Sequence, residues 1–145
     1  MIKNIIFDVD GTLTDGGIIL DSAGKEIKRF CAHDGLIMRV LPEIGIKTII
    51  MTGRKSEAVR TRGEDLKITQ IIQGLSDKAA KLTELELNLK ATAYIGDDLN
   101  DYMAMLLCGF KACPADAAQE IKEICDYVSP YNGVMVQSGT FWSIC

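Results

Sequence analysis

Residues 7–15 read FDVDGTLTD and place three aspartates directly behind the apolar run IIF. Carboxylates so close together repel one another, and a structural role for all of them at once is difficult to devise. Asp8 and Asp10 are two residues apart, so a near-strand backbone puts both side chains on the same side. The stretch therefore predicts a buried strand that ends at a site where a cation, or a reaction that uses negative charge, compensates the carboxylates.

The rest of the chain alternates short apolar runs with helical patterns. Short β-rich runs predict strands at residues 4–7, 47–51, 69–73 and 92–96. Apolar residues at three- and four-residue spacing predict helices within 35–45, 54–66, 76–89, 99–109 and 116–128. This alternation predicts an α/β fold, a doubly wound, Rossmann-like parallel sheet with helices on both faces. Pro42 is expected to end or kink the first helix near Leu41.

Residues 16–30, GGIILDSAGKEIKRF, interrupt the alternation. Two apolar-polar arms around DSAGK predict a β-hairpin that projects after the first strand. Ile18, Ile19 and Leu20 in succession are more apolar than a solvated hairpin requires. Two interpretations stay open here, a flap that lies on its own domain and a contact between subunits.

Composition narrows the class of protein. A chain of 145 residues with 48% hydrophobic content fits one domain, residues 1–145. The net charge of −4 offers no basic stripe for nucleic acid. Five cysteines without a C-x-x-C pair argue against a disulfide framework or a zinc site. The N-terminus reaches an acid too soon for a signal peptide, and no apolar run has membrane-spanning length. We therefore expect a cytoplasmic protein.

Polar residues follow the other predicted strands as well. The strand at 47–51 runs into MTGR, and the strand at 92–96 runs into GDDLND. Gly11 permits a sharp turn behind Asp10 and leaves backbone N–H groups bare to approach an anion. The carboxyl ends of parallel strands meet in one crevice. The other polar residues expected there are Thr52, Gly53, Lys78, Asp97, Asp98 and Asp101.

Such a crevice suits phosphoryl transfer to a carboxylate. Mg²⁺, a hard cation with oxygen ligands, relieves the repulsion and leaves positions for a substrate phosphate. Asp8 is the expected nucleophile, and Asp10 protonates the leaving oxygen and later activates water. Lys78 offsets the charge that builds up on the transferring group. Thr52, Lys78 and the turn amides then take the remaining phosphate oxygens.

These residues also carry a family resemblance. DVDGTLTD, TGR, the lysine at 78 and GDDLND resemble, in order, the four motifs of the haloacid dehalogenase superfamily of aspartyl phosphatases. The resemblance implies Asp8 as the nucleophile and Asp10 as the acid and base. It also implies Mg²⁺ held by the Asp8 side chain, the Asp10 backbone carbonyl and Asp97.

The spacing of the motifs leaves no room for a cap domain. The hairpin, HDG at 33–35 and TGRKSEAVRTR look like the capless 3-deoxy-D-manno-octulosonate 8-phosphate phosphatases. That resemblance implies a sugar phosphate as substrate and a homotetramer whose hairpins meet at its centre and whose subunits close each other's sites. Enzymes acting on 9-phosphorylated sialic-acid-type sugars are similar, and Arg54 favours the octulosonate group over them. The predicted substrate-binding residues are Gly11, Gly53, Arg54 and Asp34.

The resemblance covers residues 1 to about 130 and fails beyond them. The family tail is a glycine-rich segment, GG-x-G-A-V-R-E, whereas residues 131–145 read YNGVMVQSGTFWSIC. This departure keeps a catalytically weak oligomerisation domain of the phosphatase fold as an alternative. A receiver-type signalling domain shares the sheet, an acceptor aspartate, a threonine and a lysine. Asp10 argues against the receiver, because a lasting aspartyl phosphate needs no resident acid or base.

Several residues have a structural interpretation beside the functional one. Asp98 is expected to cap the helix from Leu99 rather than to act in catalysis. Asp101 either compensates the helix dipole or contacts Lys78. His33 is a loop residue or lines the pocket. Asp15 is expected to cap the turn into the hairpin. Arg60 and Arg62 are expected on a solvated helix face, although Arg62 could reach a sugar carboxylate. Core positions are expected for Met103, Met105, Leu106 and Leu107.

Overall fold

The computed structural model describes residues 1–133. Six parallel strands form the central sheet in the order β5-β4-β1-β6-β7-β8. Their bounds are β1 Asn4–Phe7, β4 Lys47–Met51, β5 Gln70–Ile72, β6 Thr92–Ile95, β7 Phe110–Cys113 and β8 Tyr127–Val128. Phe7 of β1 pairs with Ile50 of β4 and Ile95 of β6, so the residues that follow these three strands reach one edge of the sheet.

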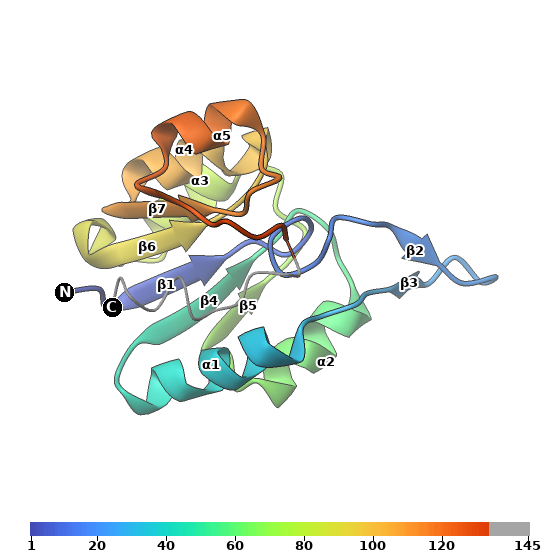
Figure 1. Cartoon of the computed structure of the whole chain (residues 1–145). Helices are drawn as coiled ribbons and strands as arrows, with labels where there is room; N and C mark the ends of the chain where they lie inside the picture. Colours follow the sequence, from blue (N-terminus) through green and yellow to red (C-terminus); the bar gives the residue numbers. More distant parts are fainter. Residues whose placement is uncertain (134–145) are drawn as a thin grey trace.

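Helices cover both faces of the sheet (Figure 1). α1 (Ala32–Glu43) and α2 (Glu57–Asp65) lie on one face. α3 (Lys78–Glu84), α4 (Leu99–Leu107) and α5 (Gln119–Ile124) lie on the other. Neighbouring β1 residues point to opposite faces, so Ile5 and Phe7 pack in one apolar core and Ile6 in the other. This is the predicted doubly wound α/β fold.

The predicted hairpin is confirmed. β2 (Ile19–Leu20) and β3 (Glu26–Ile27) pair antiparallel and project from the body of the molecule, as Figure 1 shows. The Asp21 carboxylate accepts hydrogen bonds from the amides of Ala23 and Lys25 and so closes the turn. Within residues 1–133, this hairpin is the element that separates β1 from α1, and no cap domain is inserted there.

The end of α1 lies near Leu41 as expected, because the helix stops at Glu43, one residue after Pro42. Other expected bounds were wrong. α3 ends at Glu84, and a short 3₁₀ helix, η1 (Leu89–Ala91), leads into β6. Helix α5 ends at Ile124, and β8 begins where the helix was expected to continue. The strand β7 was not predicted.

The side chains of α4 also correct an expectation. Met105 is buried, as predicted, but Met103, Leu106 and Leu107 are exposed. A helix on the outer layer of a sheet buries one stripe, and these three residues lie outside it. No helix among residues 1–133 is both long and apolar enough to cross a membrane.

The last described residues lie against the turn that follows β1. The Tyr131 carbonyl accepts from the amide of Ala115, and the Gly133 amide donates to Asp116. A Cβ atom at Gly133 would collide with the carbonyl oxygens of Gly11 and Thr14. The close approach therefore requires a glycine. The rest of the atypical tail, residues 134–145, lies outside the described residues.

Candidate active site

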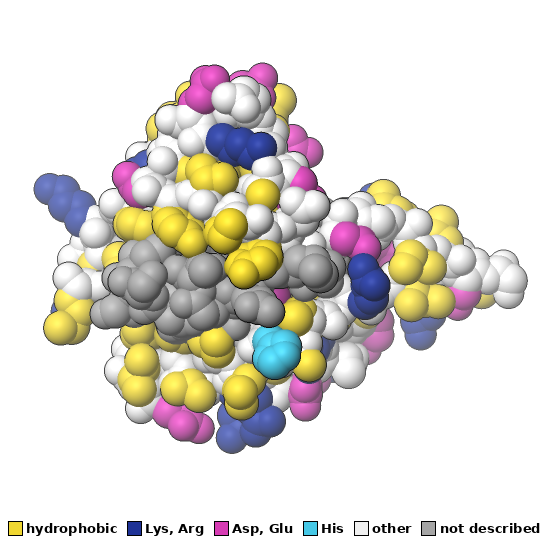
Figure 2. Space-filling view, viewed as in Figure 1, with side chains coloured by type: hydrophobic (Ala, Val, Ile, Leu, Met, Phe, Trp, Pro, Cys, Tyr) yellow, Lys and Arg dark blue, Asp and Glu magenta, His cyan; other side chains and the backbone are white. Residues whose placement is uncertain are grey.

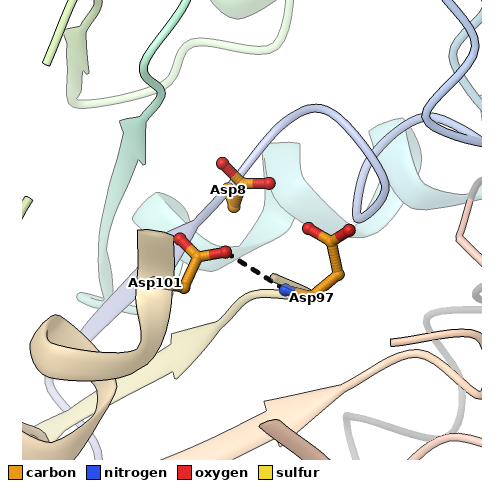
Figure 3. A group of neighbouring side chains, drawn as sticks. All are labelled: Asp8, Asp97 and Asp101. Atoms are coloured by element: carbon orange, nitrogen blue, oxygen red, sulfur yellow. Dashed lines mark hydrogen bonds between the residues drawn. The ribbon is translucent and has the colours of Figure 1, made fainter. Parts of the chain in front are cut away.

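Three carboxylates converge at the carboxyl edge of the sheet (Figure 3). Asp8 follows β1, Asp97 follows β6, and Asp101 lies in the first turn of α4. One oxygen from each residue lies within 4.8 Å of the others. The parallel register makes this convergence, because it brings the ends of neighbouring strands to the same level. All three carboxylates were expected in this crevice, and for Asp101 the sequence left open whether it compensates the helix dipole or contacts Lys78.

Lys78 is the cation of this group. It is the first residue of α3, and its side chain is 2% exposed. Its Nζ donates to Asp8 Oδ1 at 2.5 Å and to Asp101 Oδ1 at 2.6 Å. A buried lysine with two carboxylate partners is held far more firmly than a solvated one. The expected proximity of Lys78 to the first motif is therefore observed.

Asp101 is fully buried and fixed from four directions. Its Oδ1 accepts from Lys78 and from the Tyr94 hydroxyl at 2.9 Å. Its Oδ2 accepts from the backbone amides of Asp97 and Asp98 at 3.2 and 3.4 Å. Asp101 thus holds Lys78 and the loop after β6 in place. Tyr94 was missed by sequence reasoning, because an apolar strand gives no sign that its tyrosine hydroxyl reaches the site.

The proximity of the carboxylates changes their acidity. Burial, and next the negative charge of Asp101, raise the pKa of Asp8 well above its usual range, although Lys78 opposes the shift. Burial likewise raises the pKa of Asp97 to about 6. For Lys78, burial alone would lower the pKa, but the charges of Asp8 and Asp101 outweigh it and raise the pKa. The group as a whole carries more negative charge than one lysine neutralises.

The turn after Asp8 depends on a glycine and on its own hydrogen bonds. Gly11 has a φ of +91°, and a Cβ atom there would collide with the Asp97 carboxylate. The amides of Thr12, Leu13 and Thr14 all approach the Val9 carbonyl oxygen at 2.9–3.1 Å. The Gly11 amide donates to the Thr14 hydroxyl at 3.3 Å. An incoming anion would therefore compete with hydrogen bonds inside the turn, a feature that the sequence did not reveal.

The Asp10 carboxylate does not belong to the oxygen cluster of Figure 3. It forms an ion pair with Lys28, which follows β3 of the hairpin. The metal role predicted for Asp10 rests on its backbone carbonyl, so the direction of the side chain leaves that prediction standing. Lys28 was not identified from the sequence. The sequence holds no local pattern that separates it from a solvated hairpin lysine.

The second motif also reaches this edge. Thr52 directly follows β4 and is buried. Its amide donates to the Ile72 carbonyl at 3.0 Å, and its carbonyl accepts from the Leu75 amide at 3.2 Å. A Cβ atom at Gly53 would lie 3.3 Å from the Leu75 carbonyl oxygen, which is tight packing. Thr52 and Gly53 are thus anchored between β4 and the loop that leads to Lys78.

Arg54 points toward the hairpin. Its Nε donates to Glu26 Oε1 at 2.6 Å, and its guanidinium forms an ion pair with the same carboxylate. Both residues line an open cleft of about 480 Å³ between the hairpin and the start of α2. The cleft mixes charges of both signs with one apolar residue, and its other lining residues are Leu20, Gly24, Lys25, Lys55, Ser56 and Glu57.

Asp34 lies elsewhere. It is buried in the first turn of α1 and lines a small cavity with Leu13, Gly35 and Arg62. A Cβ atom at Gly35 would collide with the Arg62 guanidinium, so this glycine makes room for the arginine. Asp34 is not one of the three clustered carboxylates. Its predicted role in substrate binding therefore gains no support from the geometry around Asp8.

The structural interpretations of two other residues are confirmed. Asp98 is the N-cap of α4, and its side chain accepts from the Leu99 amide at 2.7 Å. Arg60 is half exposed and pairs along its own helix with Glu57 and Glu64. His33 is exposed on α1. Arg62 pairs with Asp65 and also donates to the Cys31 carbonyl at 3.3 Å.

The donor set fits Mg²⁺. The three carboxylates offer oxygen ligands only, which is the ligand type that Mg²⁺ prefers. With all three ionised, Lys78 leaves two negative charges without a partner, the amount that one divalent cation neutralises. The raised pKa values of Asp8 and Asp97 have the same origin, because burial without sufficient positive charge favours the protonated form.

Comparison with known proteins agrees with this site. A family model described as haloacid dehalogenase-like hydrolase matches residues 67–134. The 3-deoxy-D-manno-octulosonate 8-phosphate phosphatase of Yersinia pestis is 37% identical over 136 residues, which cover 91% of this chain and 73% of that protein. The Haemophilus influenzae enzyme of the same name is also 37% identical over 136 residues, covering 91% and 76%.

Solved structures give the same result. The 3-deoxy-D-manno-octulosonate 8-phosphate phosphatase of Moraxella catarrhalis, in complex with magnesium, phosphate and KDO, superposes with a TM-score of 0.89 at 38% identity. The match covers 95% of this chain and 83% of that one. The cobalt-bound phosphatase from Haemophilus influenzae gives a TM-score of 0.92 at 34% identity and covers 99% and 86%.

Proposed function

We propose that this chain, which belongs to the haloacid dehalogenase superfamily and within it to the 3-deoxy-D-manno-octulosonate 8-phosphate phosphatases, is a Mg²⁺-dependent phosphatase of that sugar phosphate. One observation of the molecule supports the proposal. Lys78 bridges Asp8 and Asp101 directly beside Asp97, so the proposed nucleophile, a cation and the proposed ligands of a divalent metal lie together. Phosphoryl transfer to a carboxylate needs these three groups together.

The first half of the reaction forms an acyl phosphate. An Asp8 carboxylate oxygen attacks phosphorus while the bond between phosphorus and the sugar oxygen breaks. Asp10 gives its proton to the departing sugar oxygen and becomes a carboxylate. Lys78 already touches Asp8, so its ammonium group lies where the transferring group gathers negative charge. Thr52 is proposed to bind a phosphoryl oxygen from the end of β4.

The second half restores the enzyme. Asp10 takes a proton from a water molecule, whose oxygen forms a bond to phosphorus as the bond to the Asp8 oxygen breaks. Inorganic phosphate leaves, and Asp8 is again a free carboxylate. Asp8, Asp97 and the Asp10 carbonyl would hold Mg²⁺. When bound, the ion supplies positive charge that lets a phosphate anion approach the clustered carboxylates.

The sugar is proposed to lie in the cleft between the hairpin and α2. A volume of about 480 Å³ falls within the usual range for small-molecule sites. Arg54, Lys25 and Lys55 line it and could face the carboxylate of a sugar acid. An arginine at 54 favours the octulosonate over 9-phosphorylated sialic-acid-type sugars. Gly11 and Gly53 would admit the phosphate, and Asp34 stays a weaker candidate for contact with the sugar.

Assembly and compartment belong to the same proposal. We infer a homotetramer built through the hairpin, because Ile18, Ile19, Leu20 and Ile27 are each about half exposed. Figure 2 shows apolar side chains on the surface of this projection. A cytoplasmic location is supported by Cys31, Cys108, Cys113 and Cys125, the cysteines among residues 1–133, which are all free thiols.

Phosphate release tests the function directly. With Mg²⁺ present, we expect 3-deoxy-D-manno-octulosonate 8-phosphate to be hydrolysed at least about ten-fold faster, by kcat/KM, than a 9-phosphorylated sialic-acid-type sugar or a hexose 6-phosphate. EDTA should stop turnover and Mg²⁺ restore it, with Ca²⁺ a poor substitute because its coordination is looser. Equal rates on all three phosphate esters would refute the proposed substrate preference. Full activity in EDTA would refute the proposed requirement for Mg²⁺.

A further inference from the structure

Lys28 has a buried side chain in a hairpin whose apolar residues are exposed. The hairpin around it is open to water, with Leu20 57% and Ile27 50% exposed, yet the Lys28 side chain is only 3% exposed. A lysine seldom gives up its hydration unless a partner replaces the water. The Lys28 ammonium pairs with the Asp10 carboxylate and also lies 3.3 Å from Glu26 Oε2. Its burial therefore serves the pair with Asp10.

Four alternating charges connect the hairpin with the two active-site loops. Arg54 pairs with Glu26, Glu26 with Lys28, and Lys28 with Asp10. Asp10 follows β1 and Arg54 follows β4, whereas Glu26 and Lys28 both belong to the second arm of the hairpin. The base of the hairpin is thus fastened on both sides by charge. The Asp10 carboxylate is thus paired with the hairpin and is not one of the three clustered carboxylates.

We propose that Lys28 is a positioning residue that holds the Asp10 carboxyl group on the hairpin side of Asp8, where the leaving sugar oxygen and the attacking water meet phosphorus. This inference rests on the proposed function. The Lys28 ammonium group can donate to the Asp10 carboxylate and, when Asp10 carries its proton, to its other oxygen, so it restrains the side chain in both protonation states. Proton transfer is sensitive to displacements of about 1 Å. Lys28 itself touches neither the phosphoryl group nor the cluster in this account.

The two halves of the reaction depend on Asp10 to different degrees. Release of a sugar alkoxide needs its proton, whereas release of 4-nitrophenolate needs little acid assistance because that anion is stable. Hydrolysis of the Asp8 acyl phosphate needs Asp10 to take a proton from water with either substrate. Loosening Asp10 should therefore slow both steps for a sugar phosphate but mainly the second step for 4-nitrophenyl phosphate.

The variant Lys28→Met keeps a long side chain and removes the charge. On the sugar phosphate we expect kcat to fall about 10- to 100-fold with KM changed less than about three-fold. On 4-nitrophenyl phosphate we expect a rapid burst of about one nitrophenol per active site, followed by slow turnover. Intact-protein mass spectrometry of acid-quenched samples should show the phosphorylated enzyme accumulating. Lys28→Arg, which keeps the charge, should recover part of kcat and abolish the burst.

Arg29→Met is the matched control. Arg29 is the next residue, and it pairs at 3.0 Å with Asp15, which is half exposed. Its loss removes the same charge from the same segment without touching Asp10, so kinetics should stay at the wild-type level. The proposal would be overturned if Lys28→Met slowed 4-nitrophenyl phosphate turnover without a burst, or if it raised KM strongly. An equal loss of kcat in Arg29→Met would also overturn it.

A double-mutant cycle tests whether Lys28 acts through Asp10. If Lys28 acts through Asp10, Lys28→Met should cause no further loss in an Asp10→Asn background. A full additional loss there would show that Lys28 acts by another route. Wild-type protein that hydrolyses 4-nitrophenyl phosphate but not the octulosonate phosphate would remove the substrate assignment, while the burst comparison would still decide the role of Lys28.

Discussion

At the scale of single residues, the site is a problem of charge. Lys78 contacts Asp8 and Asp101, and among the described residues it is the one cation that reaches the three clustered carboxylates. Asp101 accepts hydrogen bonds from Lys78, Tyr94 and two backbone amides, so its role is to hold the other groups of the site in place. In the proposed mechanism, Asp8 and Asp97 keep oxygens for a metal and a phosphoryl group. Of these three aspartates, one supports the site, and the other two are proposed to take part in the reaction.

Asp8→Asn tests the nucleophile. A neutral amide does not attack phosphorus, so turnover should fall below detection, at least about 10⁴-fold. The fold should survive, because Asn still accepts from Lys78 and removes one of the mutually repelling charges. Phosphate release and thermal unfolding, measured on the same sample, check both parts. Asp8→Asn protein with near-normal phosphate release would contradict the mechanism.

Asp97, a proposed metal ligand, should make Mg²⁺ binding sensitive to pH. Its pKa of about 6 in the folded, metal-free protein lies above the unfolded value of 3.8. The folded state therefore binds more protons between these values, and the stability of the metal-free protein should fall as pH rises from about 4 to about 6. Mg²⁺ needs the carboxylates without their protons. Its stabilising effect should consequently be small near pH 5 and fully developed near pH 7.5.

The measurement is the rise in melting temperature caused by Mg²⁺ at each pH. Asp97→Asn is the control, since an amide does not titrate in this range and its response to Mg²⁺ should be weak at both pH values. An equal Mg²⁺ response of the wild type at about pH 5 and about pH 7.5 would count against Asp97 as a ligand.

At the scale of elements, the start of α4 combines a structural and a functional task. Asp98 caps the helix, and Asp101 completes the capping box by accepting from the Asp98 amide. The cap fixes where the helix begins and so where Asp101 meets Lys78. A local feature of helix chemistry thereby sets the position of a buried ion pair.

Asp98→Ala tests this division of roles. Loss of an N-cap should lower the free energy of unfolding by about 0.5–2 kcal/mol. Phosphatase activity at a temperature where the protein stays folded should change less than about five-fold, because Asp98 is assigned no proton transfer. Asp98→Asn, which retains an oxygen for the Leu99 amide, should keep nearly wild-type stability in urea unfolding. A loss of activity above about 100-fold in both variants would show that Asp98 acts in the reaction itself.

At the scale of the whole molecule, the sheet supplies one wall of the site and leaves it open toward the hairpin. No cap domain covers this opening within residues 1–133. A polar sugar in an open cleft must be held against competition from water. The projecting hairpin has exposed apolar residues, and identical arms from other subunits are the natural partners in a closed symmetric oligomer.

Ile19→Lys tests the proposed assembly. Burial of each hairpin isoleucine or leucine between subunits should contribute roughly 1.5–3 kcal/mol, so a lysine there should dissociate the tetramer. Turnover of the sugar phosphate should fall more than turnover of 4-nitrophenyl phosphate. Met103→Lys, at a solvent-exposed position on α4, is the control and should leave the oligomer intact. A wild type that sediments as a monomer at micromolar concentration would refute the assembly.

The sequence alone determined the architecture and the main chemical groups. Strands β1 and β4 match their predicted bounds, because short β-rich runs end at polar residues and need no distant information. The convergence of Asp8, Lys78 and Asp97 followed from one topological rule, since parallel strands end at a common edge. Asp98 as a helix cap was likewise a local inference. Strand β7, FKAC, was missed because phenylalanine is its single β-favouring residue, and the two residues of β8 were assigned to the end of the helical pattern at 116–128.

Tertiary structure alone decided which groups touch. Lys28 meets Asp10 across 18 positions of sequence, and Lys78 meets Asp8 across 70. No local pattern distinguishes Lys28 from a solvated hairpin lysine, because its burial depends on how the hairpin leaves the sheet. The exposure of Met103 and the separation of Asp34 from the cluster have the same origin. Periodicity reports which residues share a face of one element, whereas contact and burial depend on the neighbouring elements packed against that face.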